Sequence, residues 1–522
     1  MIWVFILAVE EPWPLRLIHK LSISLGMLSL IAASGCGTGG SFVLPTTTGN
    51  YSQASLKGSY VYQIHGTEFA TLQAVPYREF GVFSADGAGN ITAESDDAST
   101  NPGSTFSCNS TCGNYQIGSD GTGFITLNNS AFSSSFSPSL GPITLAITLT
   151  SSAKVYLMEA DVFADGGGLA EFQDPTAISA TPNGTFVFRL HQAISTQSGQ
   201  APASEVGVMT VSGGALVSPS SMDQNVLGAG NSSLTLTAGV FHPPSTLGRG
   251  LGSFTDSASV TTSFVYYIVD TSKVALLVIN SGAVAAGSAE AQTGAVSNGL
   301  SGSYAFGSRG DDSKFFDGVA TVGQFTAGSG TISGVEDSMQ NGTYSNGNLT
   351  GSYTTGSNGR VAVTLNSGAI RQVFWMVSPS RAFFLTNSTS QVEDGTADLQ
   401  TVSSFSPATM NGQFAMVMDG IDLTSFPVTG SVGTLARIGP LQFNGSGKLA
   451  LTELANDSLT GSGALSPGPL TGTYQVSSNG RIVGNLNNNS LDLVIYAASA
   501  SDAYALQVDG FTNTSGTIEL QH

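Results

Sequence analysis

Leu300-Ser-Gly302-Ser-Tyr304-Ala-Phe306 is the stretch that decides the fold, because close variants of it open four successive segments of the chain. The other three are Leu56-Lys-Gly58-Ser-Tyr60-Val-Tyr62, Asn183-Gly184-Thr-Phe186-Val-Phe188 and Met410-Asn-Gly412-Gln-Phe414-Ala-Met416. Large apolar side chains at alternate positions are typical of a strand with one buried face. The opening glycines are 126, 118 and 110 residues apart, and this repetition predicts four tandem β units of one kind.

The four copies also end alike, with an acidic residue two positions before a glutamine. These pairs are Glu171 and Gln173, Glu290 and Gln292, Asp398 and Gln400, and Glu519 and Gln521. We interpret them as structural: each carboxylate accepts hydrogen bonds that close the last strand of a unit on its first. A Ca²⁺ site clusters several oxygen ligands, and one acid per segment is too few. We therefore expect no metal and no cofactor.

Between these ends, Gly-rich and Asn-Gly turns separate about eight strand-like segments per copy. Short connections between consecutive strands favour an antiparallel meander, and eight such strands can close into a barrel. We predict an all-β chain of four meander units, barrel-like or built as two-sheet sandwiches. Half-copies also resemble each other, so an eight-bladed propeller is the alternative. The units are expected at residues 56–175, 180–294, 298–402 and 408–522.

The opening Gly-x-Tyr/Phe of each copy is similar to the first strand of lipocalins and avidins. This resemblance implies β-barrels that can hold a small ligand. It covers only a few residues of each unit, and none of the ligand-binding residues of those families can be placed on this sequence.

Composition limits the classes of function. Only 10% of the 522 residues are charged, 41% are hydrophobic, and the net charge is −19. An acidic chain does not suit nucleic acid, whose phosphates need a basic surface. The hydrophobic content is sufficient for packed cores.

The N-terminal segment is interpreted as a targeting signal. Residues 1–35 contain a basic flank and a 13-residue apolar run at 21–33, which is typical of a signal peptide. Ala33-Ser34-Gly35-Cys36 resembles the lipobox of bacterial lipoproteins, which implies that Cys36 is lipidated. Residues 36–55 are rich in Gly, Ser and Thr and are expected to form a tether. The whole pattern resembles uncharacterised tandem-repeat surface lipoproteins of Gram-negative bacteria, which implies delivery to the outer membrane.

The remaining two cysteines, Cys108 and Cys112, are predicted to form a short-loop disulfide in an oxidising compartment. A metal site is the alternative, but no further ligands lie nearby in the sequence.

Candidate catalytic residues are few. The mature chain contains His65, His191 and His242 before its terminal histidine, and we interpret them as surface or loop residues. The paired carboxylates at Asp96-Asp97 and Asp311-Asp312 are expected to be solvated loop charges. No H-E-x-x-H, G-x-S-x-G or P-loop motif occurs.

Three functions remain, and we rank them as follows. The first is a non-enzymatic cell-envelope lipoprotein that displays repeated β units for binding or adhesion, with a glycan, a small apolar ligand or a surface protein as partner. The second is a structural envelope spacer without a ligand, in which the alternating aromatic residues fill the interiors. The last is an enzyme that acts on polysaccharide.

Overall fold

The computed structural model describes most of the chain after its N-terminal segment. The described residues are 51–68, 75–99, 105–128, 142–160, 164–196, 199–312, 318–368, 370–425, 432–459, 463, 468–487, 490–510 and 512–522. The predicted signal peptide, the tether up to residue 50 and the predicted lipidation residue Cys36 lie outside them. Within the described part no helix is long and apolar enough to cross a membrane.

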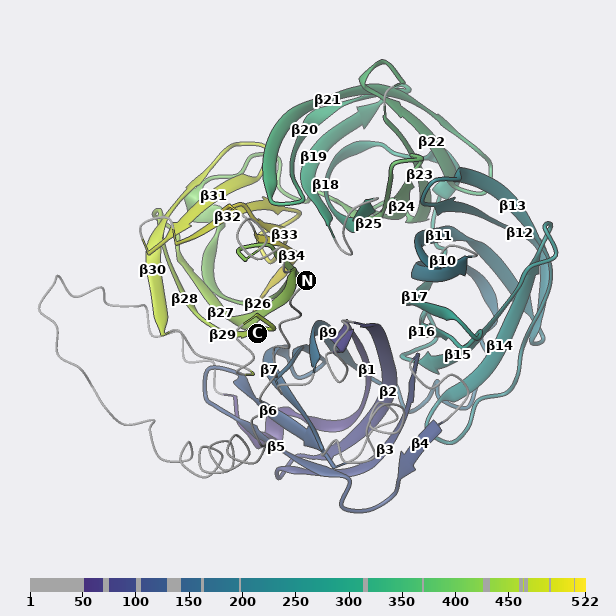
Figure 1. Ribbon diagram of the computed structural model, residues 1–522, viewed down its shortest axis with the longest axis horizontal. Helices are drawn as coiled ribbons and strands as arrows, with labels where there is room; N and C mark the ends of the chain where they lie inside the picture. Colours follow the sequence, from purple (N-terminus) through teal and green to yellow (C-terminus); the bar gives the residue numbers. More distant parts are fainter. Residues whose placement is uncertain are drawn as a thin grey trace, which may run out of the picture. The chain divides into compact units, whose positions relative to one another are not determined.

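The described chain is almost entirely strand, arranged as four closed antiparallel barrels in tandem (Figure 1). Barrel 1 consists of β1 (Lys57–Glu68), β2 (Val75–Asp86), β3 (Asn90–Ala98), β4 (Thr105–Cys108), β5 (Gly113–Ile117), β6 (Thr122–Leu127), β7 (Ile143–Ser151), β8 (Lys154–Glu159) and β9 (Ala164–Phe172). Barrel 2 consists of β10 (Gly184–Thr196), β11 (Gly199–Ser212), β12 (Ala215–Val226), β13 (Gly230–Phe241), β14 (Arg249–Asp256), β15 (Thr261–Ile268), β16 (Lys273–Val278) and β17 (Ala283–Ala291).

The second half of the chain repeats this order. Barrel 3 consists of β18 (Gly302–Asp312), β19 (Val319–Gly328), β20 (Thr331–Gln340), β21 (Thr343–Thr355), β22 (Arg360–Leu365), β23 (Ile370–Ser378), β24 (Arg381–Thr386) and β25 (Gln391–Leu399). Barrel 4 consists of β26 (Asn411–Asp422), β27 (Gly433–Asn444), β28 (Lys448–Thr452), β29 (Leu454–Asp457), β30 (Pro469–Val476), β31 (Arg481–Leu486), β32 (Leu491–Ala497), β33 (Asp502–Gln507) and β34 (Thr512–Leu520).

Every barrel has eight strand positions, although barrels 1 and 4 have nine labelled strands. In barrel 4, β27 pairs with β28 and then with β29, so these two short strands share one position. In barrel 1, β3 pairs with both β4 and β5. The first strand closes each barrel by pairing with the second and the last. The prediction of four tandem antiparallel units is therefore confirmed in its barrel form, and the propeller alternative is wrong.

Side chains fill the barrel interiors. The aromatic residues predicted as core from their alternation are all buried: Tyr60, Tyr62, Phe186, Phe188, Tyr304 and Phe414. In barrel 3, Tyr304 stacks on Phe325 with ring centroids 5.4 Å apart, and Phe374 stacks on Phe384 at 4.8 Å. Aromatic pairs at such separations contribute stability beyond their buried area. The buried residues of each interior form one apolar core cluster.

Four further apolar clusters join the barrels to one another. Each combines the outer face of the first strands of one barrel with the outer face of the late strands of the next. Val61 of barrel 1 packs in a cluster with Tyr267 of barrel 2, for example. The fourth cluster contains Ala415 of barrel 4 and Tyr156 of barrel 1, so the series of contacts closes on itself. Burial of apolar surface stabilises each of these interfaces at about 25 cal/mol per Å².

Candidate functional site

The opening strand of each barrel has a second face that points away from its own core. Counted from the opening glycine, the residues at positions 2, 4 and 6 lie inside the barrel, as Tyr60, Tyr62 and Ile64 do. Successive side chains alternate across a strand, so positions 3, 5 and 7 point outward. In the copies these outward residues are Val61, Gln63 and His65; Val187, Arg189 and His191; Ala305, Gly307 and Arg309; and Ala415, Val417 and Asp419.

Positions 5 and 7 of all four copies line one cavity of about 280 Å³. The cavity therefore belongs to the place where the four barrels meet. Its size is close to the lower end of the range for small-molecule sites. The repeat is strict at the structural positions, yet the four residues at position 7 differ: His65, His191, Arg309 and Asp419. Four identical charges brought together here would repel one another, and this mixed set forms ion pairs instead.

Asp419 is held by two cationic or polar partners from other barrels. Arg309 donates from Nη1 to Asp419 Oδ2 at 2.7 Å, and His65 Nε2 lies 3.0 Å from the same oxygen. The carboxylate fits against barrel 1 because residue 167 is glycine: a Cβ there would lie 2.9 Å from Asp419 Oδ1. Three barrels thus meet at one carboxylate.

These contacts determine the charge states of this group. Burial raises the pKa of Asp419, but Arg309 and His65 outweigh burial, so its pKa is lowered. Burial, together with the nearby guanidinium of Arg309, lowers the pKa of His65 to about 4. At neutral pH the cavity therefore contains an ionised Asp419 and a neutral His65.

A second carboxylate, Asp394 of barrel 3, is held from barrel 2. His191 Nδ1 lies 2.7 Å from Asp394 Oδ1, and Ser204 donates its hydroxyl to the same oxygen at 2.7 Å. Arg189 Nε is farther away, 3.5 Å from Asp394 Oδ2. Burial raises the pKa of Asp394, but His191 and Arg189 outweigh burial, so its pKa is lowered.

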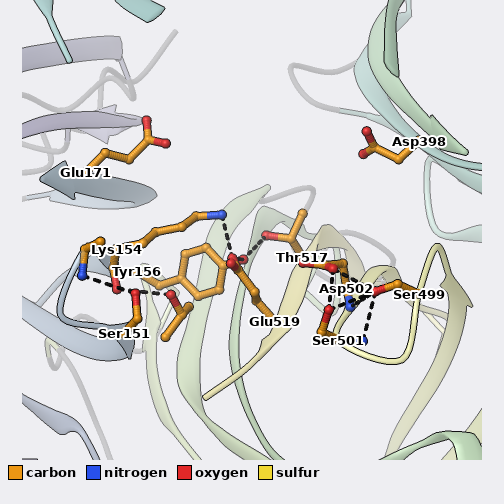
Figure 2. A network of polar contacts seen from close by, with 12 residues as sticks. Ser151, Lys154, Tyr156, Glu171, Asp398, Ser499, Ser501, Asp502, Thr517 and Glu519 are labelled. Atoms are coloured by element: carbon orange, nitrogen blue, oxygen red, sulfur yellow. Dashed lines mark hydrogen bonds and ion pairs between the residues drawn. The ribbon is translucent and has the colours of Figure 1, made fainter. Parts of the chain in front are cut away.

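The acidic residues of the closing motifs lie at the barrel interfaces. Glu519 of barrel 4 accepts hydrogen bonds from Lys154 at 2.5 Å and Tyr156 at 3.1 Å, both of barrel 1 (Figure 2). Glu171 is bound by Lys273, Glu290 by Arg381 and Asp398 by Tyr504, each from the next barrel. We expected these carboxylates to close the last strand on the first strand of the same barrel, and that expectation was wrong. They connect each barrel to its neighbour.

The glutamines of the closing motifs make the same kind of connection. Gln400 of barrel 3 donates to the carbonyl oxygens of Asn479 and Ala497 of barrel 4, at 2.9 and 2.8 Å. Gln173 and Gln292 donate to two carbonyls of the following barrel in the same way. Gln521 of barrel 4 donates to Asp120 and Leu149 of barrel 1. The motif is therefore repeated because each copy needs the same contact with its neighbour.

Three of the four interfaces also contain a buried charge triad, which we define as an aspartate, an arginine and an aromatic donor. Each arginine donates through Nε and Nη2 to both oxygens of the aspartate, at 2.6 or 2.7 Å, and an aromatic O–H or N–H donates to the same carboxylate. The triads are Asp97, Arg249 and Tyr267; Asp223, Arg360 and Trp375; and Asp337, Arg481 and Tyr496.

The interface of barrel 4 with barrel 1, called here the 4–1 interface, lacks this triad. Strand register identifies the equivalent residues: Leu454 for the aspartate, Thr122 for the arginine and Thr148 for the aromatic donor. The aspartate, the arginine and the aromatic donor of the triad are therefore all replaced at this interface. The 4–1 interface keeps the closing-motif contacts, and Asn456 donates to two carbonyls of barrel 1 at 3.0 Å. The equivalent Asn225 of barrel 2 donates to two carbonyls of barrel 3 in the same way. The 4–1 interface is therefore the interface with the weakest charge pairing.

The structure corrects other sequence-based expectations. His65 and His191 are not surface or loop residues but line the central cavity. The paired carboxylates Asp96-Asp97 and Asp311-Asp312 are buried, not solvated. Asp97 belongs to a charge triad with barrel 2, while Asp96 is on the opposite face of the strand, toward the acidic group inside barrel 1.

Other candidate residues have clear positions. Cys108 and Cys112 form a disulfide, with Cα atoms 5.7 Å apart. His242 lies at the end of β13 and is exposed. In the described part of the chain, no group of three or more His, Cys, Asp or Glu side chains is arranged to hold a metal ion.

Sequence reasoning missed Arg189, Asp394, the triad arginines and the triad aspartates Asp223 and Asp337. The arginines had a detectable signal, because Arg249, Arg360 and Arg481 each follow the glycine of an equivalent turn. The aspartates had a weaker signal: Asp97 and Asp223 both lie 39 residues after their opening glycines, and Asp337 lies 35 residues after its own.

Comparison with known proteins gives no family assignment. No family model matches the chain, and no curated protein matches it. Solved structures that match include a mutant of Transferrin Binding Protein B from Haemophilus parasuis Hp5, with 9% identity over 76% of this chain and 86% of that chain and a TM-score of 0.20. The isotype 1 protein of that name from serogroup B Neisseria meningitidis has 10% identity over 71% and 84%, with a TM-score of 0.20. Intact Ap-TbpB, with N and C lobes, has 7% identity over 94% and 98%, with a TM-score of 0.19. Likeness at these scores supports no statement about function.

Proposed function

We propose that this chain is a non-catalytic cell-envelope lipoprotein, anchored through Cys36 to the outer membrane, whose four barrels together bind a small polar ligand. The observation that carries the proposal is the central cavity, which all four barrels line. The barrel interiors are packed, so binding inside single barrels has less support. Ligand sites commonly lie between packed units and contain a few convergent polar groups.

Hydrogen-bonding groups without protein partners face this cavity. Among the described residues, the side-chain amide of Gln63 and the hydroxyl of Ser515 line the cavity and make no hydrogen bond. They come from barrels 1 and 4. Buried polar groups are normally satisfied by protein, water or ligand. A small polar molecule in the cavity would satisfy groups from several barrels at once.

Catalysis has less support than binding. A glycosidase needs one carboxylic acid that stays protonated near neutral pH and a second carboxylate opposite it. The pKa values of both cavity carboxylates, Asp394 and Asp419, are lowered, so neither can act as the acid. His65, with a pKa of about 4, is a weak base.

A thermal-shift screen of the full chain in detergent tests the proposed binding. Sugars, organic acids, Ca²⁺ and apolar small molecules are the probes. We expect polar probes to raise the melting temperature, because a ligand at 100 times its Kd adds about 2.7 kcal/mol of stability. The double variant Gln63→Leu, Ser515→Ala should lose the shift. A flat response to every class would contradict the proposal and support the structural spacer.

The proposed anchor is tested separately. Cys36→Ser removes the thiol that would be lipidated, so we expect the protein to leave the membrane fraction and to lose incorporation of labelled palmitate. Two or more acyl chains hold a protein stably on a membrane, which makes the expected release nearly complete. Ser34→Ala is the matched control and should remain membrane-bound. Retention of the Cys36→Ser protein in the outer membrane would contradict lipid anchoring.

A further inference from the structure

We propose that the ligand of the central cavity is a small organic carboxylate and that Arg189 binds its carboxylate group. This inference rests on the proposed function and names the chemical class of its ligand. It is carried by the unusual state of Arg189, which lines the cavity without a close acidic partner.

Arg189 differs from the arginines that stabilise the interfaces. Arg249, Arg360 and Arg481 each donate two hydrogen bonds to one aspartate at 2.6 or 2.7 Å. Arg189 makes one hydrogen bond, from Nη1 to Thr396 Oγ1 at 3.2 Å. A guanidinium has five N–H donors. Most of the donors of Arg189 are therefore without a protein acceptor.

The nearest carboxylate does not satisfy Arg189. The Oδ1 atom of Asp394 already accepts from His191 and Ser204 at 2.7 Å, whereas its Oδ2 atom is 3.5 Å from Arg189 Nε. That separation exceeds a normal hydrogen bond. Asp394 thus supplies local charge balance but leaves the N–H fork of Arg189 available.

Arg189 is nevertheless held in position. Its guanidinium lies 5.3 Å from the ring centroid of Phe383, and Thr396 fixes one edge. Its side chain is 31% exposed, which is enough for a ligand to reach it. A planar, oriented guanidinium matches the two oxygens of a carboxylate and binds them through two parallel hydrogen bonds.

The surroundings favour an anion. Arg78 and Arg309 also line the cavity, while its two carboxylates are already bound by side chains of other barrels. Gln63 occupies in barrel 1 the position that Arg189 occupies in barrel 2 and adds an uncommitted amide. A neutral sugar would use the amide but offers no pair of charged oxygens to the N–H fork of Arg189. A carboxylate satisfies both.

Isothermal titration of the full chain in detergent at pH 7 tests this inference, with succinate, glucose, inorganic phosphate and putrescine as probes. We expect succinate to bind, and Arg189→Gln to weaken its binding at least tenfold. Arg189→Lys keeps the charge but not the fork, so its affinity should be intermediate. Lys57→Gln removes one positive charge from an exposed position and should leave the affinity unchanged.

The outcomes separate the two proposals. Glucose or phosphate binding that depends on Arg189, without succinate binding, would overturn the carboxylate inference and leave the central cavity as a binding site. Succinate binding that is equal in Arg189→Gln and the natural chain would overturn the role of Arg189. Absence of binding by every probe, together with a flat thermal-shift screen, would overturn both proposals. Circular dichroism of each variant verifies that the barrels remain folded.

Discussion

Asp337→Ala is expected to lower the free energy of unfolding by about 3–5 kcal/mol, because removal of one partner of a buried ion pair leaves the other charge uncompensated. The Asp337 side chain is fully buried at the interface of barrels 3 and 4. It accepts two hydrogen bonds from Arg481 at 2.7 Å and one from the hydroxyl of Tyr496 at 2.6 Å. The hydroxyl of Tyr344 and the amide of Asn346, both of barrel 3, also donate to this carboxylate. Alanine would leave all of these donors without their acceptor.

Urea unfolding of the natural chain, Asp337→Ala, Arg481→Met and the double variant measures this effect. The double variant should lose less than the two single variants added together, since it no longer contains an unpaired charge. Thr122→Ala is the matched control, because Thr122 is the residue of the 4–1 interface equivalent to Arg481. Thr122 is partly buried and its hydroxyl donates one hydrogen bond to Asp120 at 2.7 Å, so its replacement should cost only about 1 kcal/mol. Strictly additive losses for the pair would show that the triad does not act as a unit.

Glu94→Gln is expected to stabilise the protein at neutral and alkaline pH. Burial inside barrel 1, with a smaller contribution from Asp96, raises the pKa of Glu94 to about 9. The folded chain therefore keeps the proton that the unfolded chain releases near pH 4.5. The stability that depends on this proton is complete below about pH 4.5 and is lost as the pH rises toward 9. Glutamine does not titrate, so the gain at pH 7 should be about 3 kcal/mol.

Unfolding free energies at pH 4.5, 7 and 9 check this sign. The gain from Glu94→Gln should be near zero at pH 4.5 and should grow with pH. Asp86→Asn is the control of opposite direction: Asp86 is exposed, and hydrogen bonds from Asn90 and Ala88 lower its pKa. That variant should lose stability above the unfolded pKa and gain none. A pH-independent effect of Glu94→Gln would mean that the carboxyl is not held protonated.

The interior of each barrel could be predicted from sequence because a strand alternates. Tyr60, Phe186, Tyr304 and Phe414 recur at one distance from their glycines, and large apolar residues at such positions require a core. The closed barrel follows from eight short strands with short connections. The choice between barrel and sandwich depends on strand register, which the sequence leaves open.

The cavity could not be predicted in the same way, because its residues lie on the other face of these strands. A histidine on the outer face of an isolated barrel would be solvated, which is why His65 and His191 were interpreted as surface residues. Their true surroundings depend on contacts between barrels that are far apart in sequence, such as His65 with Asp419. The different residues at position 7 were visible in the sequence, but nothing in the sequence indicated that they face one another.

The 4–1 interface has a consequence for self-association. Each barrel offers an early-strand face to the late-strand face of the next, and within one molecule the fourth barrel offers its face to the first. Leu454, Thr122 and Thr148 replace the charge triad at the 4–1 interface. If this interface opens, no aspartate or arginine of a triad loses its partner. In such a head-to-tail interface, the early-strand face of one molecule can bind the late-strand face of another molecule. A molecule opened at the 4–1 interface would expose one face of each type, and opened molecules could add end to end into a filament.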